Sequence, residues 1–322
     1  MKILAVSWIK GVPVPPKGYG GIERTVATLC AEWKRQGHSV VLIAPQGSCV
    51  DGVGIIETSD FMEAYEDIQD MPFDVVFDNS CWSPESPVRR PLNKPFLSVT
   101  HVNHAVGHTR NVVYLSTAQR NAHAEQTKRD LSQSPVVRVP TDPTLKPIGL
   151  ERKDYLLFLG MVAEHKGVHR AAEIAQMLDR ELIVAGPAYG EYSDKVAAMP
   201  NVQMIGEVQD PQRSALLEQA FAVMCLHGNE GGWIEPGCGV VGEAGAFNTP
   251  VAALPNGCLG EIVYNDCNGW IDEGTGSVAL RMRDNPTLPH ADQLALNDWS
   301  AETIAKQYVG LFERVINGET WG

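Results

Sequence analysis

The chain has 322 residues, of which 44% are hydrophobic, so it is long and apolar enough for two domains with separate cores. It carries 26 Lys and Arg against 39 Asp and Glu, and a net charge of −13 with a pI near 5.1 argues against a protein that holds nucleic acid. The first 150 residues carry 15 basic and 15 acidic side chains and the remainder 11 and 24, so the acidic excess lies in the second half.

The cysteines and the apolar runs favour a cytoplasmic protein. Seven cysteines form no Cys-x-x-Cys pair, which indicates buried thiols in a reducing compartment and not a disulfide framework. No apolar run approaches the roughly 18 residues that span a bilayer. We therefore expect no transmembrane segment.

The amino-terminal half alternates apolar strands with helices. The continuous apolar strand Val40–Ala44, which follows a strand and a helix, indicates a parallel sheet covered on both faces. In chain order the pattern predicts strand 3–8, helix 21–36, strands 40–44, 74–77, 96–100 and 112–114, and helix 118–131.

A second unit of the same kind begins near Tyr155, after a Pro-rich linker at 139–147. The predicted elements are strand 155–159, helix 168–178, strands 182–185 and 202–205, helix 211–220, strand 222–226, helix 239–247 and strand 251–254. Helix 301–316 has one apolar face and is predicted to pack back on the first unit. The order predicts an α/β protein with two doubly wound, Rossmann-like domains facing a cleft, at 1–148 (with 302–322) and at 149–301.

The stretch from Trp233 to Val251 places two carboxylates, Glu235 and Glu243, on either side of a glycine-rich bend. A helix that begins at such a bend offers backbone N–H groups and a positive dipole end, which suits a phosphate. Glu243, one turn into that helix, can accept hydrogen bonds from a sugar hydroxyl. Taken alone, the stretch also fits an ordinary loop–helix–strand junction with two solvated acids.

The order Glu-Pro-x-x-Gly-Val-x-x-Glu-Ala, followed by Thr-Pro-Val, resembles the donor-site signature of the retaining family 4 glycosyltransferases, which have the GT-B fold. Four further segments resemble the family in the expected order: 19–24 its first glycine loop, 158–167 its phosphate-binding loop, 184–187 the next strand end, and 297–300 its carboxyl-terminal crossover. The resemblance spans nearly the whole chain, and it implies two GT-B domains with the donor on the second and the acceptor on the first.

The resemblance implies where the donor phosphates are bound. Lys166 matches a lysine that contacts them in the family. Preorganised donors of this kind are worth about 2.7–4 kcal/mol each for a developing oxyanion. The other donor-binding positions that the resemblance implies are Gly20, Gly21, Cys238, Gly239 and Val240.

The resemblance also implies residues that hold the sugars. Glu235 would bind hydroxyls of the transferred sugar, and Glu243 those of the ribose. His101 follows strand 96–100 and matches a family histidine beside the donor sugar. His101, Glu235 and Lys166 are therefore the expected catalytic residues.

Three positions depart from the family pattern. Met161 stands where an arginine usually follows the first glycine of the phosphate loop, and a thioether cannot donate to an oxygen. The nearest substitute cation is His165. Gly237 replaces a usual Phe and Asn248 a usual Gly, which affects the details of the sugar pocket and not the fold.

Metal and dinucleotide sites are not expected. His101, His104 and His108 could form a metal site by spacing, but no carboxylate or Cys lies within that stretch. The sequence contains no Asp-x-Asp pair for a diphosphate-bound metal. Glu23 occupies the place of the third glycine of a Gly-x-Gly-x-x-Gly motif, so an NAD fingerprint is not supported.

The resemblance implies a retaining hexosyltransferase without a cofactor, and the absence of an Asp-x-Asp pair predicts that it is metal-independent. Its donor substrate would be a UDP- or GDP-linked sugar, and its acceptor a sugar, a lipid-linked molecule or a small molecule, with no nucleic acid. An epimerase or a phosphorylase would share the fold, but the Glu-Pro…Glu-Ala signature and the lack of a cofactor lysine favour transfer. Met161 leaves open a catalytically weak or inactive nucleotide-sugar binder.

Overall fold

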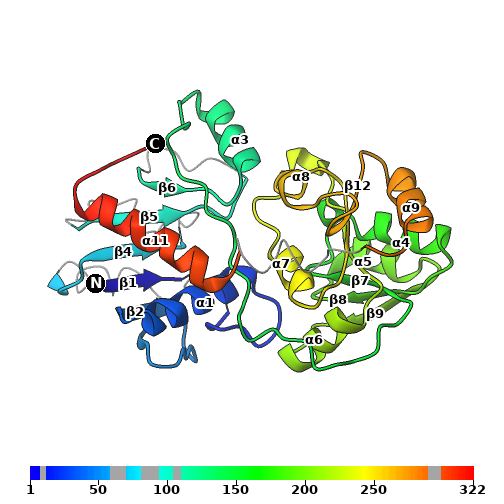
Figure 1. Ribbon diagram of the computed structural model, residues 1–322, viewed down its shortest axis with the longest axis horizontal. Helices are drawn as coiled ribbons and strands as arrows, with labels where there is room; N and C mark the ends of the chain where they lie inside the picture. Colours follow the sequence, from blue (N-terminus) through cyan, green and yellow to red (C-terminus); the bar gives the residue numbers. More distant parts are fainter. Residues whose placement is uncertain (8–11, 59–69, 81–93, 104–109, 289–298) are drawn as a thin grey trace. The chain divides into compact units, whose positions relative to one another are not determined.

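A computed structural model describes residues 1–7, 12–58, 70–80, 94–103, 110–288 and 299–322 (Figure 1). The chain divides into two compact units, one of Met1–Pro16, Gly20–Asp142 and Ser300–Gly322, the other of Lys17–Tyr19 and Pro143–Trp299. The main division, after Asp142, lies within the Pro-rich stretch that the sequence analysis took as the linker. Among the described residues, no helix combines the length and apolar character needed to cross a membrane.

The first unit contains a parallel sheet of six strands in the order β3-β2-β1-β4-β5-β6. Its strands are β1 (Lys2–Val6), β2 (Ser39–Ala44), β3 (Gly54–Glu57), β4 (Val75–Asp78), β5 (Phe96–Val99) and β6 (Val112–Val113). In the register, Val6 pairs with Asp78 and Asp78 with Ser98. The residues that follow β1, β4 and β5 therefore emerge together at the carboxyl edge of the sheet, where α/β proteins bind ligands.

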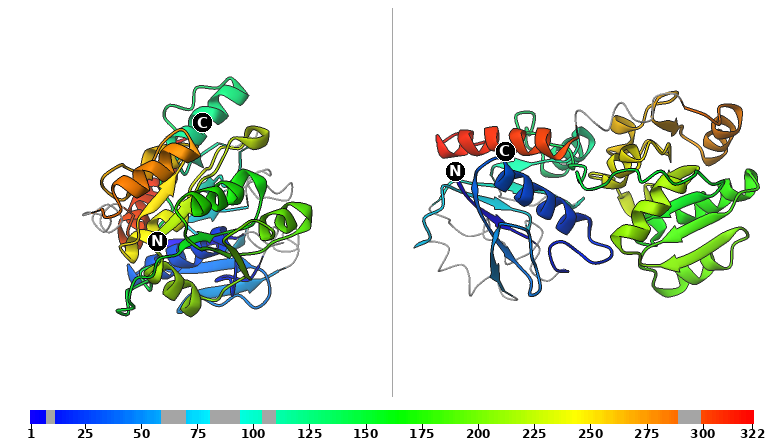
Figure 2. Two further views of the ribbon diagram at one scale, coloured as in Figure 1. Left: turned by 90° about the vertical axis from the view of Figure 1, so that its right-hand side faces the viewer. Right: turned by 60° about the horizontal axis from the view of Figure 1, so that its bottom comes forward.

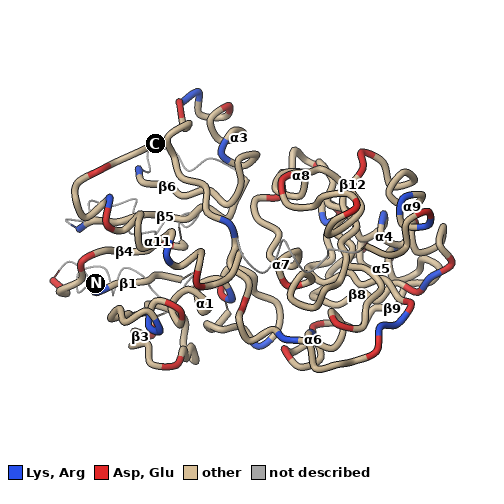
Figure 3. The backbone as a smooth tube through the Cα atoms, in the orientation of Figure 1, with Lys and Arg blue, Asp and Glu red and all other residues tan. Residues whose placement is uncertain are grey.

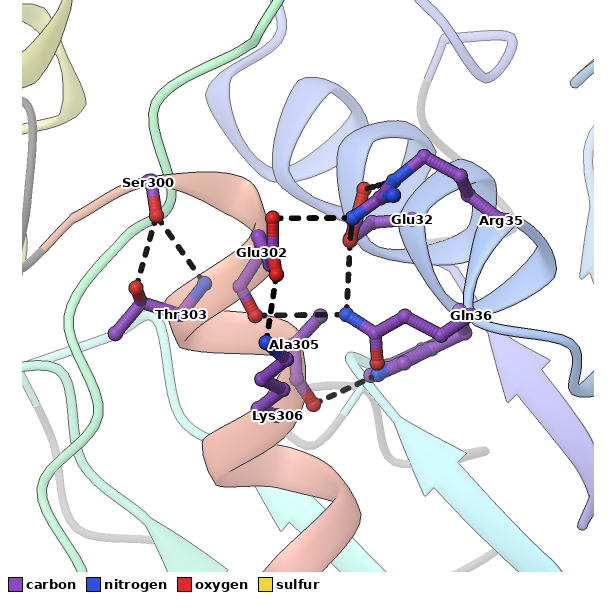
Figure 4. A network of polar contacts seen from close by, with 9 residues as sticks. Glu32, Arg35, Gln36, Ser300, Glu302, Thr303, Ala305 and Lys306 are labelled. Carbon is purple, nitrogen blue, oxygen red and sulfur yellow. Dashed lines mark hydrogen bonds and ion pairs between the residues drawn. The ribbon is translucent and has the colours of Figure 1, made fainter.

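Helices α1 (Gly21–Arg35) and α11 (Ala301–Ile316) pack together on one face of this sheet (Figures 1 and 2). Trp33 of α1 donates from Nε1 to the carbonyl of Ala305 over 3.1 Å, and its ring packs against Phe77, Tyr308 and Phe312. Figure 4 shows the polar rim of this contact, where Arg35 lies 3.2 Å from Glu302. The predicted return of the carboxyl-terminal helix to the first unit is confirmed.

The second unit contains another parallel sheet of six strands, in the order β12-β11-β10-β7-β8-β9. Its strands are β7 (Leu156–Leu159), β8 (Leu182–Ala185), β9 (Val202–Gly206), β10 (Ala222–Cys225), β11 (Val251–Ala253) and β12 (Gly269–Ile271). Its α-helices are α4 (Val168–Met177), α5 (Gly190–Ala197), α6 (Asp210–Gln219), α7 (Gly239–Ala246), α8 (Leu259–Ile262) and α9 (Thr275–Asp284). α4 and α9 pack into the core on one face, α6 and α7 into that on the other.

The predicted fold class is confirmed, and so is every element predicted within the described residues, with small changes of bounds. The largest change is in α3 (Thr117–Thr127), predicted to continue to residue 131, which ends because Lys128 adopts a left-handed conformation with φ 56°. Gln209 is the N-cap of α6, and Asp210 is its first helical residue. The strands mostly lack charged residues, which lie on helices and loops (Figure 3).

Candidate active site

The first part of the site is the loop after β7, which carries Lys166. This lysine ends a single 3₁₀ turn, η2 (Glu164–Lys166), and Gly167 then adopts φ 70° before α4 begins. A Cβ at Gly167 would lie 1.9 Å from the carbonyl oxygen of Leu226, just after β10. The amide of Gly228 also donates to the carbonyl of His165 over 3.0 Å. The loops that follow the neighbouring strands β7 and β10 are thus held in contact.

Lys166 and Glu235 form a buried ion pair in this loop contact. Nζ of Lys166 lies 2.6 Å from Oε2 of Glu235, and the two side chains are 15% and 6% exposed. The same carboxylate oxygen accepts a hydrogen bond from Nε1 of Trp233 over 3.2 Å and lies 2.8 Å from Nδ1 of His227. Two residues that the sequence analysis proposed separately are therefore neighbours in space.

The backbone around Glu235 is fixed by the loop that follows β11. The carbonyl of Glu235 accepts from the amide of Cys258 over 2.9 Å, and Asn256 donates to the carbonyls of Trp233 and Gly228. Gly257 has φ 59°, and a Cβ there would lie 2.2 Å from the carbonyl oxygen of Glu235. The position of Glu235 therefore depends on a close backbone contact that only glycine allows.

The charges of this pair are set by burial and by each other. Burial alone would raise the pKa of Glu235, but the ammonium of Lys166 opposes it and is the largest cause that holds the pKa well below its usual range. Burial likewise opposes the charge of Lys166, yet Glu235 raises the pKa of that lysine. Both groups are therefore charged at neutral pH. Burial lowers the pKa of His227, which favours its neutral form.

The surroundings of His165, the nearest substitute for an arginine at position 161, disfavour its charged form. Its ring lies 4.1 Å from that of Trp233, and burial lowers its pKa, so the neutral imidazole is favoured near pH 7. Lys166 also lies over the ring of Trp233, 4.9 Å from Nζ to the ring centroid. Arg170, on α4, is paired with Glu230. The structure thus places Lys166 as the cation beside Glu235.

Glu243, on α7, is paired with Arg213 of α6, and the two side chains are 14% and 9% exposed. The sequence analysis expected the N–H groups of Cys238, Gly239 and Val240 to face a phosphate. At the start of α7, however, the amide of Cys238 already donates a hydrogen bond to Sγ of Cys258 over 3.2 Å. The remaining two of these residues, Gly239 and Val240, form the first turn of α7.

The candidate residues of the first unit lie after β1 and β5. Nε2 of His101 lies 3.0 Å from Oδ1 of Asn79. His101 is partly exposed, and the burial of its imidazole lowers the pKa to about 4. Gly20 precedes α1, where a Cβ would lie 2.8 Å from Pro16, whereas Gly21 faces open space. His104 and His108, the other members of the histidine-spacing hypothesis, lie outside the described residues.

Sequence reasoning missed four side chains that organise the site: Trp233, Arg213, Asn256 and His227. His227 had a detectable signal, since it follows the buried strand β10 just as His101 follows β5. Its Nδ1, Glu235 and Sγ of Cys238 offer three ligand atoms within 4.8 Å of one another. Arg213 and Asn256 come from other elements, so no local spacing connects them with Glu243 or Glu235.

Comparisons with known proteins show the family and the fold of this chain. The profile of the family described as glycosyl transferases group 1 matches residues 144–279. The structure of AviGT4, a glycosyltransferase involved in avilamycin A biosynthesis, matches with a TM-score of 0.86 and 31% identity over 100% of this chain and 99% of that one. A comparison with curated protein sequences gives no match.

More distant structures share the fold. HepE of Anabaena, solved with UDP and glucose, matches with a TM-score of 0.74 and 15% identity, over 97% of this chain and 99% of that one. WaaG, a glycosyltransferase involved in lipopolysaccharide biosynthesis, matches with a TM-score of 0.66 and 14% identity, over 99% of this chain and 100% of that one. The chain therefore belongs to the glycosyl transferases group 1 family, the family 4 glycosyltransferases of GT-B fold.

Proposed function

We propose that the protein transfers a hexose from a UDP- or GDP-linked donor to a hydroxyl group of an acceptor, with retention of the anomeric configuration and without a metal ion. The buried pair of Lys166 and Glu235, at the carboxyl ends of β7 and β10, carries this proposal. It puts a cation and an anion side by side, as a donor with a diphosphate next to a hydroxylated sugar requires. HepE, a distant relative in fold, was solved with UDP and glucose.

Each member of the pair has a distinct task in the proposed reaction. As the bond from the sugar to the diphosphate breaks, negative charge grows on the leaving oxygen, and the ammonium of Lys166 offsets it. The carboxylate of Glu235 accepts hydrogen bonds from sugar hydroxyls and favours the positive charge that develops on the sugar ring. Trp233 donates to that carboxylate and so fixes its direction. Lys166 and Glu235 are already held in place. Little reorganisation of these side chains is therefore needed when contacts with the donor replace their contact with each other.

We assign the other proposed site residues by their surroundings. Glu243 accepts from the ribose hydroxyls, with Arg213 holding its carboxylate in place. His101 contacts the transferred sugar as a neutral group, because its pKa of about 4 leaves it unprotonated at neutral pH.

The acceptor is assigned to the first unit. Oγ of Ser7 and Nδ2 of Asn79 are buried without a hydrogen-bond partner among the described residues. Ser7 and Asn79 directly follow the paired residues Val6 and Asp78 of β1 and β4. A buried polar group without a hydrogen-bond partner lowers stability, and a hydroxyl group of the acceptor would supply that partner.

The first test combines binding with product analysis. A thermal-shift screen against UDP- and GDP-linked sugars identifies the donor, because a ligand of the folded state raises the melting temperature. Transfer from that donor is then followed, and the product linkage is assigned by NMR. We expect a product of the same anomeric configuration as the donor. An inverted linkage would contradict the proposed stereochemistry, and donor binding without transfer to any acceptor or to water would favour the inactive binder.

Chelation supplies a second prediction. Since Lys166 and the first turn of α7 are the proposed stabilisers of the diphosphate, transfer in excess EDTA should proceed at the rate measured without it. The control is the same assay with added Mg²⁺ or Mn²⁺, which should bring no more than a small change. Loss of activity in EDTA that a divalent ion restores would show that the leaving group needs a metal.

A further inference from the structure

The second unit contains a cluster of potential metal ligands. The proposed transfer reaction does not use this cluster to bind a metal ion. Nδ1 of His227, a carboxylate oxygen of Glu235 and Sγ of Cys238 lie within 4.8 Å of one another, and all three residues are buried. They come from the end of β10 and from the bend before α7. Imidazole, thiolate and carboxylate are the ligands that zinc takes in proteins.

A second thiol lies next to the cluster but is not part of it. Sγ of Cys225, the last residue of β10, lies 3.8 Å from Sγ of Cys238, whereas the three mutually close ligand atoms belong to His227, Glu235 and Cys238. Three protein ligands with solvent in the fourth position are a usual tetrahedral arrangement for zinc.

The contact between His227 and Glu235 is a second, independent indication. Nδ1 of His227 lies 2.8 Å from Oε2 of Glu235, and by hydrogen-bond geometry this buried nitrogen has no partner among the described residues. Buried ring nitrogens are normally satisfied. A metal ion would satisfy His227 and Glu235 together.

We propose that His227, Glu235 and Cys238 bind a thiophilic divalent cation of the zinc type, and that this cation and the sugar donor exclude each other. The exclusion, though not the binding, rests on the proposed function, because Glu235 is also the proposed sugar ligand. On binding, the thiol of Cys238 loses its proton to solvent and bonds to the metal as a thiolate. The site is therefore inhibitory and leaves transfer itself metal-independent.

Lys166 competes with the cation for the same carboxylate. Its ammonium lies 2.6 Å from Oε2 of Glu235. A metal ion bound to the same oxygen would repel the ammonium at such a short distance, so the two cannot both lie there. The lysine side chain must swing away when the metal binds. Removing the ammonium should therefore strengthen metal binding. A substitution that only damaged the fold would weaken it.

The test measures metal binding in the absence of any donor. The protein is stripped with a chelator and titrated with Co²⁺ as a spectroscopic substitute for Zn²⁺. We expect one equivalent to bind with the charge-transfer band of a thiolate–cobalt bond. The band should disappear in Cys238→Ser, and His227→Ala should weaken binding at least about tenfold, since even outer partners of metal ligands are worth about 10–100-fold. Cys49→Ser and Cys267→Ser, two thiols outside the cluster, are the controls and should bind as the parent does.

Lys166→Met provides the decisive variant because it should raise the affinity for Co²⁺ at least about tenfold. A parent and a Lys166→Met protein that both lack the thiolate band would overturn the proposal, and so would a band that survives Cys238→Ser. Competition with the donor is measured separately. If Co²⁺ binds but nucleotide sugars do not displace it, the metal site stands and the exclusion is wrong, which then places the sugar elsewhere.

Discussion

Lys166→Ala is expected to lower the turnover number for glycosyl transfer on the order of a hundredfold or more, the cost of one preorganised donor to a developing oxyanion. Met161 provides no second cation in this loop, and burial keeps His165 neutral near pH 7. Removing the ammonium therefore leaves mainly backbone dipoles to offset the charge of the diphosphate. Steady-state kinetics and nucleotide binding, measured beside the parent and beside the exposed Lys195→Ala of α5, test this. Near-parent activity would show that another cation holds the diphosphate.

The same substitution also affects stability, and the two effects have to be separated. Without Lys166, the carboxylate of Glu235 stays buried without its ammonium, and breaking a buried pair costs about 3–5 kcal/mol. The double variant Lys166→Met/Glu235→Gln removes both charges, so it should recover most of the free energy of unfolding without recovering turnover. A double variant as unstable as the single one would mean that the pair is not the source of the loss.

The pH dependence of stability gives an independent check on the pair. The pKa of Glu235 in the folded protein lies well below its usual 4.5. The carboxylate therefore stabilises the fold above the unfolded pKa, and this contribution is lost as the pH falls below about 4.5 toward the folded pKa. The double variant lacks the titrating carboxylate and should lose less stability over that acid range than the parent.

Met161→Arg is the converse change in the same loop. If the loop keeps the family geometry, an arginine there adds a planar fork of donors that matches a phosphate. Nucleotide affinity should then rise, whereas an arginine that turns away from the loop would leave it unchanged.

The fold was predictable because its signals are local. β4 and β5 are short, mostly apolar segments buried along their whole length, and α11 has the apolar face that its sequence indicates. The strands and helices that were missed, such as β12 and α5, are short and follow glycine-rich or mixed stretches without a clear period. Their place is fixed by neighbours in the sheet and not by their own residues.

The site was only partly predictable because it depends on which strands are neighbours. Lys166 and Glu235 are separated by 69 positions, and they meet because β7 and β10 pair directly. Periodicity does not give that order, so their common role came from the resemblance. Two further contacts link different elements: the ion pair of Glu243 with Arg213, and the cluster around His227. No sequence motif predicts either of them.

A methyl group at Gly167 should disrupt the site more than the same change at Gly190, a glycine of nearly equal φ. Gly167 has φ 70° and Gly190 has φ 72°, so alanine at either position costs roughly 1–2 kcal/mol for the left-handed backbone. Only Gly167 faces another chain segment, with its Cβ 1.9 Å from the carbonyl oxygen of Leu226, whereas nothing lies within 4 Å of a Cβ at Gly190. The difference between the two variants therefore isolates the contact between the loops after β7 and β10.

Gly167→Ala should lower the free energy of unfolding by about 1–3 kcal/mol more than Gly190→Ala, the usual cost of forcing an extra methyl group into a packed site. The backbone of Leu226 cannot yield cheaply, because it continues the central strand β10, so the loop that carries Lys166 must move instead. A displacement near 1 Å can cost about a hundredfold in rate, and kcat/KM should fall by that order in Gly167→Ala alone. Chemical denaturation and steady-state kinetics on the two variants measure both effects. Equal losses would mean that the left-handed backbone, and not the loop contact, limits this position.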